Sequence, residues 1–109
     1  TYCANDQETY WDYHVKLYQL QQHVDDGWAN ADRLRAIAFS LDLNMETFDD
    51  CMNSKEHYSR VAFHKQKAST DFGANSTPTF VIVGPTGVAE KIVGAHPYST
   101  FVSVLDQML

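Results

Sequence analysis

The two cysteines are the residues best able to do chemistry, and their spacing limits what that chemistry can be. Cys3 and Cys51 stand far apart, and the chain has no Cys-x-x-Cys. A redox-catalytic pair needs a low thiolate pKa and solvent access, usually with Cys-x-x-Cys at a helix N-terminus. Two cysteines are also too few to define a disulfide framework, and lone thiols often pack as small apolar residues. The sequence predicts no catalytic residue in this chain.

The histidines give weaker signals. His57 and His64 fall two turns apart on one predicted helix, and with Cys51 they are the candidates for zinc ligands. Three loosely spaced donors without a Cys-x-x-Cys are poor evidence for zinc, so we expect no metal and no cofactor. His14 is expected to be a hydrogen-bonded core histidine, because no Ser or Cys nucleophile is recognisably paired with it.

The segment after Pro78 reads as a strand that is apolar on both sides. Phe80 and Ile82 would point to one sheet face, and Val81 and Val83 to the other. Proline has no N–H for a ladder and holds the preceding residue extended, so Pro78 belongs at the entrance of the strand.

A hairpin and a helix follow this strand. Residues 84–87, Gly-Pro-Thr-Gly, have proline and glycine where a type I turn with a glycine bulge places them, and 88–93 reads as the returning strand. Pro97 suits the start of a helix. The apolar stripe of that helix comprises Phe101, Val104, Leu105 and Met108.

Four helices are predicted before the hairpin, each from apolar residues at spacings of three and four. Their expected N-caps are Asn5 or Asp6, Asn30 or Asp32, Asn44, and Ser54, and the fourth helix ends at Gly73. Their inward residues are expected to be Tyr10, Tyr13, Leu17, Leu20 and Val24; Leu34, Ile37, Ala38 and Leu41; Met45, Phe48 and Met52; and Tyr58, Val61, Ala68 and Phe72. A second stripe on the first helix, Trp11, His14 and Tyr18, indicates that it touches two neighbours. The predicted order is four helices, a hairpin and a helix.

Length and charge restrict the protein class. With 109 residues, 44% of them hydrophobic, the chain forms one domain at most. A net charge of −6 argues against nucleic acid or an anionic membrane surface as a partner. No apolar run is long enough for a membrane span, and no signal peptide is recognisable. We expect Thr1 to mark a cut, because the first residues resemble the tail of a helix.

Three motifs carry a resemblance to a known family. The order of Pro78, hairpin and helix resembles the C-terminal half of a thioredoxin fold. Cys3-Ala-x-x-Gln, followed by Tyr-Trp-x-Tyr-His and Leu-Tyr, is similar to the helical insertion of DsbA-family thiol-disulfide oxidoreductases. Phe48-x-x-Cys51-Met-x-Ser and Ser76-Thr-Pro-Thr-Phe are similar to two later motifs of that family, although Ser76 stands where the family has glycine.

The resemblance implies a fold and a site. The fold would be α/β, or α+β in this portion: one thioredoxin-like domain over 1–109, with a helical insertion at 1–74 and the cis-proline loop, hairpin and last helix at 75–109. Ser76, Thr77 and Pro78 would bind substrate, with a cis bond before Pro78 and the Thr77 backbone pairing with an extended peptide. Cys3 and Cys51 would form a structural disulfide in an extracytoplasmic, periplasmic or cell-envelope compartment.

The resemblance also leaves alternatives open. Nothing in the chain matches the family's Cys-x-x-Cys or the strand before it, so we expect a portion that is inactive alone, while the intact protein exchanges disulfides with protein or peptide thiols. One alternative is a non-catalytic thioredoxin-like peptide-binding or assembly module. Another is a related isomerase or a glutathione transferase-like domain.

The strand at 79–83 raises a question of pairing. It carries no charge, and no proline follows its first position, whereas Glu90 and Lys91 lend charge to the returning strand. A two-stranded hairpin is marginal by itself. We therefore expect a homodimer, built through the 79–83 edge or by exchange of elements, with a two-fold axis.

Overall fold

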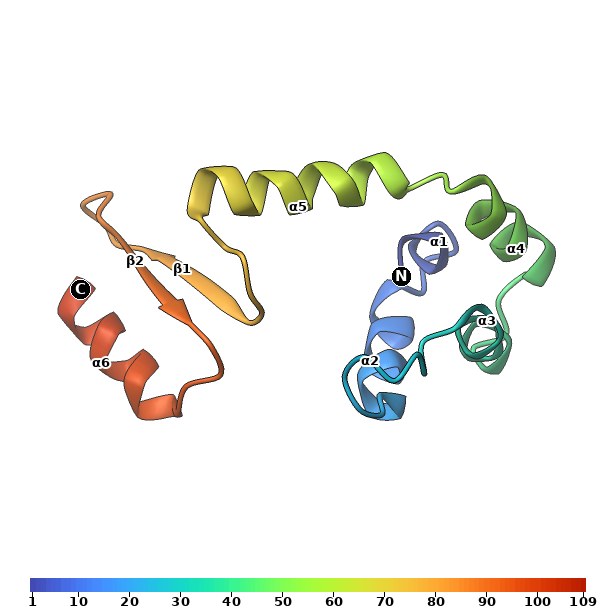
Figure 1. The fold of residues 1–109 in the computed structure, drawn as a ribbon, viewed down its shortest axis with the longest axis horizontal. Coiled ribbons are helices and arrows are strands. Elements are labelled where there is room, and N and C mark those ends of the chain that lie inside the picture. The colour runs from blue at the N-terminus through green and yellow to red at the C-terminus, as the bar shows by residue number, and fades with distance from the viewer. The chain divides into compact units, whose positions relative to one another are not determined.

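The computed structural model describes all residues from 1 to 109 and divides them into two units, Thr1–Arg60 and Val61–Leu109 (Figure 1). The predicted mixture of helices with an antiparallel hairpin is confirmed. That both units form one domain, with the boundary at 74 and 75, stays a prediction. None of the helices has the length and hydropathy needed to cross a membrane.

The first unit is helical. It contains α1 (Tyr2–Asn5), α2 (Tyr10–Leu20), α3 (Ala31–Ser40) and α4 (Met45–Ser54), and α5 (Tyr58–Phe72) begins at its end. The predicted N-caps of α3 and α4 are correct, because the Asn30 side chain accepts a hydrogen bond from Arg33 N and the Asn44 side chain accepts one from Thr47 N. Each cap satisfies an N–H that the first turn of a helix leaves without a partner.

Two predicted caps are wrong. The residue before α2 is Thr9, and Asn5 and Asp6 lie at the end of α1. Ser54 closes α4, where its hydroxyl donates to the Cys51 carbonyl oxygen. Serine and asparagine side chains bond nearby backbone in several local geometries, so their presence does not by itself fix the start of a helix.

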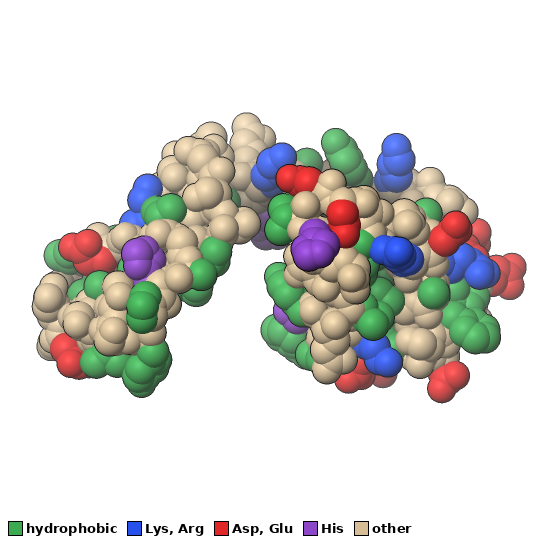
Figure 2. Space-filling view, turned by 60° about the horizontal axis from the view of Figure 1, so that its bottom comes forward, with side chains coloured by type: hydrophobic (Ala, Val, Ile, Leu, Met, Phe, Trp, Pro, Cys, Tyr) green, Lys and Arg blue, Asp and Glu red, His purple; other side chains and the backbone are tan.

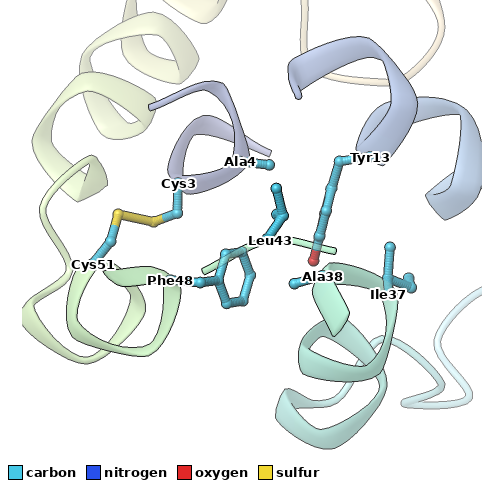
Figure 3. Close-up of a cluster of buried hydrophobic side chains, with 8 residues drawn as sticks. All are labelled: Cys3, Ala4, Tyr13, Ile37, Ala38, Leu43, Phe48 and Cys51. Carbon is cyan, nitrogen blue, oxygen red and sulfur yellow. A yellow bond between two sulfur atoms is a disulfide. The ribbon is translucent and has the colours of Figure 1, made fainter. Parts of the chain in front are cut away.

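The core of the first unit joins its four complete helices (Figure 3). The Tyr13 and Phe48 rings, both almost fully buried, lie 5.9 Å apart between centroids. The Tyr13 hydroxyl donates to the Leu34 carbonyl oxygen at 2.9 Å, and burial raises the pKa of Tyr13 to about 12. The cluster comprises Cys3, Ala4, Tyr13, Ile37, Ala38, Leu43, Phe48 and Cys51.

The second unit holds the hairpin and the last helix. β1 (Thr79–Val83) pairs antiparallel with β2 (Ala89–Val93), and α6 is Tyr98–Met108. The turn needs Gly87, whose φ of +83° is unfavourable for other residues. Phe80 packs edge-on against Phe101 of α6 at 4.9 Å, so α6 covers one face of the hairpin.

Several predicted buried faces are exposed. No residue of α5 is buried, and its Tyr58, Val61 and Phe72 are exposed, as are Met52 of α4 and Leu20 of α2. Val24 lies beyond the end of α2 and is exposed too. An apolar stripe specifies a face that can be buried, but it does not supply the surface that covers it. Figure 2 shows hydrophobic side chains at the surface of both units.

The second stripe of α2 is also open. Trp11 and Tyr18 are 70% and 68% exposed. The His14 ring is half-buried between them, with centroids 5.5 Å from Trp11 and 4.9 Å from Tyr18. His14 makes no side-chain hydrogen bond, so its prediction as a hydrogen-bonded core histidine is wrong; aromatic stacking positions it instead.

Candidate functional site

Two side-chain hydrogen bonds hold the loop that precedes β1. The Ser69 hydroxyl bonds Asn75 Oδ1 at 2.7 Å, and the Thr79 hydroxyl donates to the Ser76 carbonyl oxygen at 2.6 Å. The Thr77–Pro78 peptide bond is cis. These contacts fix the loop on both sides of Thr77.

Thr77 itself presents an unused backbone. Its N–H and C=O take part in no hydrogen bond with the rest of the chain, and the residue is exposed. With Ser76 it lines a surface hollow of about 560 Å³ that also includes Lys65 and Ser69. A residue whose backbone N–H and C=O are fixed in place and unpaired can bind an extended chain by hydrogen-bonding to that chain's backbone.

The edge of β1 continues this unpaired backbone. The Pro78 carbonyl oxygen accepts a hydrogen bond from Gly94 N at 2.8 Å. In the register of the hairpin, Phe80 and Ile82 are therefore the residues of β1 whose backbone bonds to β2. Because antiparallel ladders alternate, the N–H and C=O groups of Thr79, Val81 and Val83 point to the opposite edge. β2 is the only strand paired with β1, so this edge offers three donors and three acceptors.

A disulfide joins α1 to α4. Cys3 and Cys51 are bridged across 48 positions of sequence, with Cα atoms 5.8 Å apart. Both residues are 6% exposed, and Figure 3 shows their bonded sulfur atoms among the core side chains. The chain has no free cysteine, so both of its cysteine sulfur atoms are in this bridge.

Polar groups gather beside the bridge. His57 Nε2 lies 2.6 Å from Asp6 Oδ2, and that carboxylate oxygen lies 3.7 Å from Cys51 Sγ. The Tyr2 ring packs 5.5 Å from the His57 ring between centroids and carries Arg60 on its face, 4.3 Å from the centroid. Sequence reasoning missed the pairing of Asp6 with His57. Each of the two follows one of the cysteines within a few residues, but nothing in the sequence marks the left-handed turn at Lys55 that brings them together.

A comparison with protein families decides the relationship. The family model described as Thioredoxin matches residues 1–107. The chain belongs to the thioredoxin family. Neither the curated proteins nor the solved structures give a significant match.

This thioredoxin-family chain carries its predicted site residues in two groups. Cys3 and Cys51 lie together in the first unit, whereas Ser76, Thr77 and Pro78 are consecutive in the second. His64, which the sequence made a possible zinc ligand with Cys51 and His57, lies in the second unit and is absent from every group of converging donor atoms.

Proposed function

We propose that this chain is the polypeptide-binding portion of a DsbA-like thiol-disulfide oxidoreductase. The observation that carries the proposal is the exposed backbone of Thr77, whose N–H and C=O have no partner in the chain. The three motifs that resemble those of the DsbA family support it.

The binding chemistry follows from the backbone. An extended substrate chain would exchange hydrogen bonds with Thr77, each contributing about 1 kcal/mol. Such contacts carry little sequence preference, which suits an enzyme that handles many protein thiols. Pro78 keeps Thr77 extended, and Ser76 borders the hollow beside it.

The redox chemistry would come from a Cys-x-x-Cys in another segment of the protein. There, a thiolate forms a mixed disulfide with the substrate and a second thiolate resolves it. Cys3 and Cys51 are buried in their own bridge, so we propose a structural role for them. We expect the chain alone to give no turnover in an insulin-reduction assay, and appreciable turnover would contradict this division of roles.

The binding role is tested with two substitutions at one position. Thr77→Pro removes the N–H and should weaken binding of a reduced, carboxymethylated polypeptide about fivefold, the equivalent of about 1 kcal/mol. Thr77→Val keeps both backbone groups and should bind as the parent does. Fluorescence anisotropy measures the affinity, and circular dichroism checks the fold. Equal binding by all three proteins would refute the proposal.

The alternative of a non-catalytic peptide-binding module uses the same Thr77 edge without redox chemistry. One observation favours it: both cysteines are joined in a buried bridge, so the chain has no free thiol for redox chemistry. The gene sequence upstream of Thr1 distinguishes the readings: a strand followed by Cys-x-x-Cys supports the oxidoreductase, and a natural start near Thr1 supports the module. A replaced first cysteine would indicate the isomerase or glutathione transferase-like class.

An extracytoplasmic location fits the disulfide. Bridges form and persist in oxidising compartments such as the periplasm and are rare in the cytosol. We propose the periplasm or cell envelope as the site of action.

We propose that a second copy of the chain pairs with the free edge of β1. A two-fold axis at Val81 would place Val81 opposite its own copy and Thr79 opposite Val83, so that three outward residues from each copy exchange six main-chain hydrogen bonds. Phe80 and Ile82 would then continue one apolar face across the axis, and no like charges would meet because 79–83 has none.

Sedimentation tests this dimer. Val81→Lys sets two ammonium groups opposite each other and should weaken the dimer roughly tenfold or more. Val93→Lys makes the same change on the same sheet face but on β2, and should leave the dimer intact. A parent chain that is monomeric at micromolar concentration would refute the pairing.

A further inference from the structure

We propose that reduction of the Cys3–Cys51 bridge creates a zinc site formed by Cys3, Cys51, His57 and Asp6. The first observation is the convergence of donors: the two sulfur atoms and a His57 ring nitrogen all lie within 4.8 Å of one another. His57 also belongs to a second group on that scale, with Asp6 and Glu56. Two thiolates, an imidazole and a carboxylate form a donor set typical of zinc.

Local backbone structure brings these donors together. Asp6 follows Cys3 by one helical turn and ends α1, where its N–H donates to the Tyr2 carbonyl oxygen. After α4, Lys55 adopts a left-handed conformation with φ +55°, and Glu56 N donates to the Cys51 carbonyl oxygen. This reversal returns His57 to the side of the bridge.

The distance between Asp6 and Cys51 suits a tetrahedral ion, and the other donors must move apart to admit it. Oxygen at about 2.1 Å and sulfur at about 2.3 Å from zinc are roughly 3.6 Å apart in a tetrahedron, and Asp6 Oδ2 already lies 3.7 Å from Cys51 Sγ. Asp6 Oδ2 and His57 Nε2 are 2.6 Å apart and must open to roughly 3.4 Å for the ion to enter between them. Both side chains are partly exposed, which gives them the freedom to move.

The bridge itself prevents this coordination in the oxidised protein. A dithiol, from a protein or a small molecule, supplies two electrons and two protons: the S–S bond breaks, two cysteine thiols form, and the reductant becomes a disulfide. Zinc then binds both sulfur atoms as thiolates and releases the two thiol protons. The ion takes the place of the covalent bond and keeps α1 attached to α4.

Four protein ligands make this a closed, structural site. The surroundings favour a cation, because the donors are anionic when both cysteines are thiolates, whereas Glu56 converges with Asp6 and His57 but not with the two sulfur atoms. Tyr2 packs against the His57 ring and restricts its orientation. The consequence is a chain that binds zinc only under reducing conditions.

The experiment uses the full chain, reduced with a dithiol, desalted without oxygen and titrated with Zn²⁺ against a chromophoric chelator. We expect one zinc per reduced chain and none on the oxidised chain, with a rise in the melting temperature of the reduced chain alone. Co²⁺ as a substitute should give the absorption bands of tetrahedral thiolate coordination. Absence of stoichiometric binding to the reduced chain would overturn the proposal.

Matched variants locate the ligands. His57→Gln should weaken zinc binding roughly 100-fold or more, since loss of a group that only hydrogen-bonds to a metal ligand already costs 10- to 100-fold. His64→Gln, an exposed histidine outside the cluster, should have no effect. Asp6→Asn should weaken binding and Glu56→Gln should not, although both remove one negative charge. Equal affinity of His57→Gln and the parent, or the reverse order for the two acids, would overturn the assignment; circular dichroism confirms that each variant is folded.

Discussion

Removing the bridge between α1 and α4 tests how the first unit is held together. The double substitution Cys3→Ala with Cys51→Ala frees the unfolded chain from a closed loop that spans 48 positions. By loop-closure entropy a loop of this length contributes about 4 kcal/mol. A chain of 109 residues has a total stability of about 5 to 15 kcal/mol. The variant should therefore lose between a quarter and most of its free energy of unfolding.

Urea unfolding followed by far-ultraviolet circular dichroism measures this loss. The unsubstituted chain, reduced with a dithiol and kept in a chelator, is the matched control and should lose a similar amount. Both should unfold at lower urea concentration than the oxidised chain. A double variant within about 1 kcal/mol of the oxidised parent would refute the argument, because the loop term alone is several times larger.

Three further predictions concern single side chains. Burial raises the pKa of Tyr13 to about 12 from 10.0, so the tyrosine ionises first in the unfolded state, and the free energy of unfolding should fall as pH rises from 10 to 12. Tyr13→Phe should abolish that fall in urea titrations, and it should cost about 1 kcal/mol because the hydrogen bond to Leu34 is lost. Asn44→Ala removes the α4 cap and should cost about 1 kcal/mol of unfolding free energy in the same assay, and no change would contradict the capping role. Gly87→Ala meets no atom within 4 Å, so backbone strain at φ +83° alone should destabilise the hairpin by about 1 kcal/mol; an unchanged thermal transition would argue against it.

Local patterns predicted the local structure well. The caps at Asn30 and Asn44 and the hairpin turn at 84–87 depend on residues within four positions of one another, and all three are as predicted. Failures at Asp6 and Ser54 have a common cause. Both side chains have other partners, His57 and the Cys51 carbonyl oxygen, and the periodicity of one helix cannot indicate such partners.

Burial and the candidate site were harder to predict, because both depend on surfaces far away in sequence. The stripe of α5 is apolar at helical spacing, yet none of its residues is buried. The approach of His57 to Cys51 depends on the left-handed turn at Lys55, and lysine gives no signal for that conformation, which glycine or asparagine adopts more readily. The exposed backbone of Thr77, by contrast, follows from the loop motif around Pro78.

The free edge of β1 has a practical consequence for producing the protein. A five-residue strand without charge that exposes three peptide units has the composition of segments that assemble into fibrils. The net charge of −6 opposes such assembly at low ionic strength. Added salt screens that repulsion, so the yield and clarity of a recombinant preparation should depend on the salt concentration of the buffer. Val81→Lys places a charge within the aggregation-prone strand and should keep concentrated samples clear.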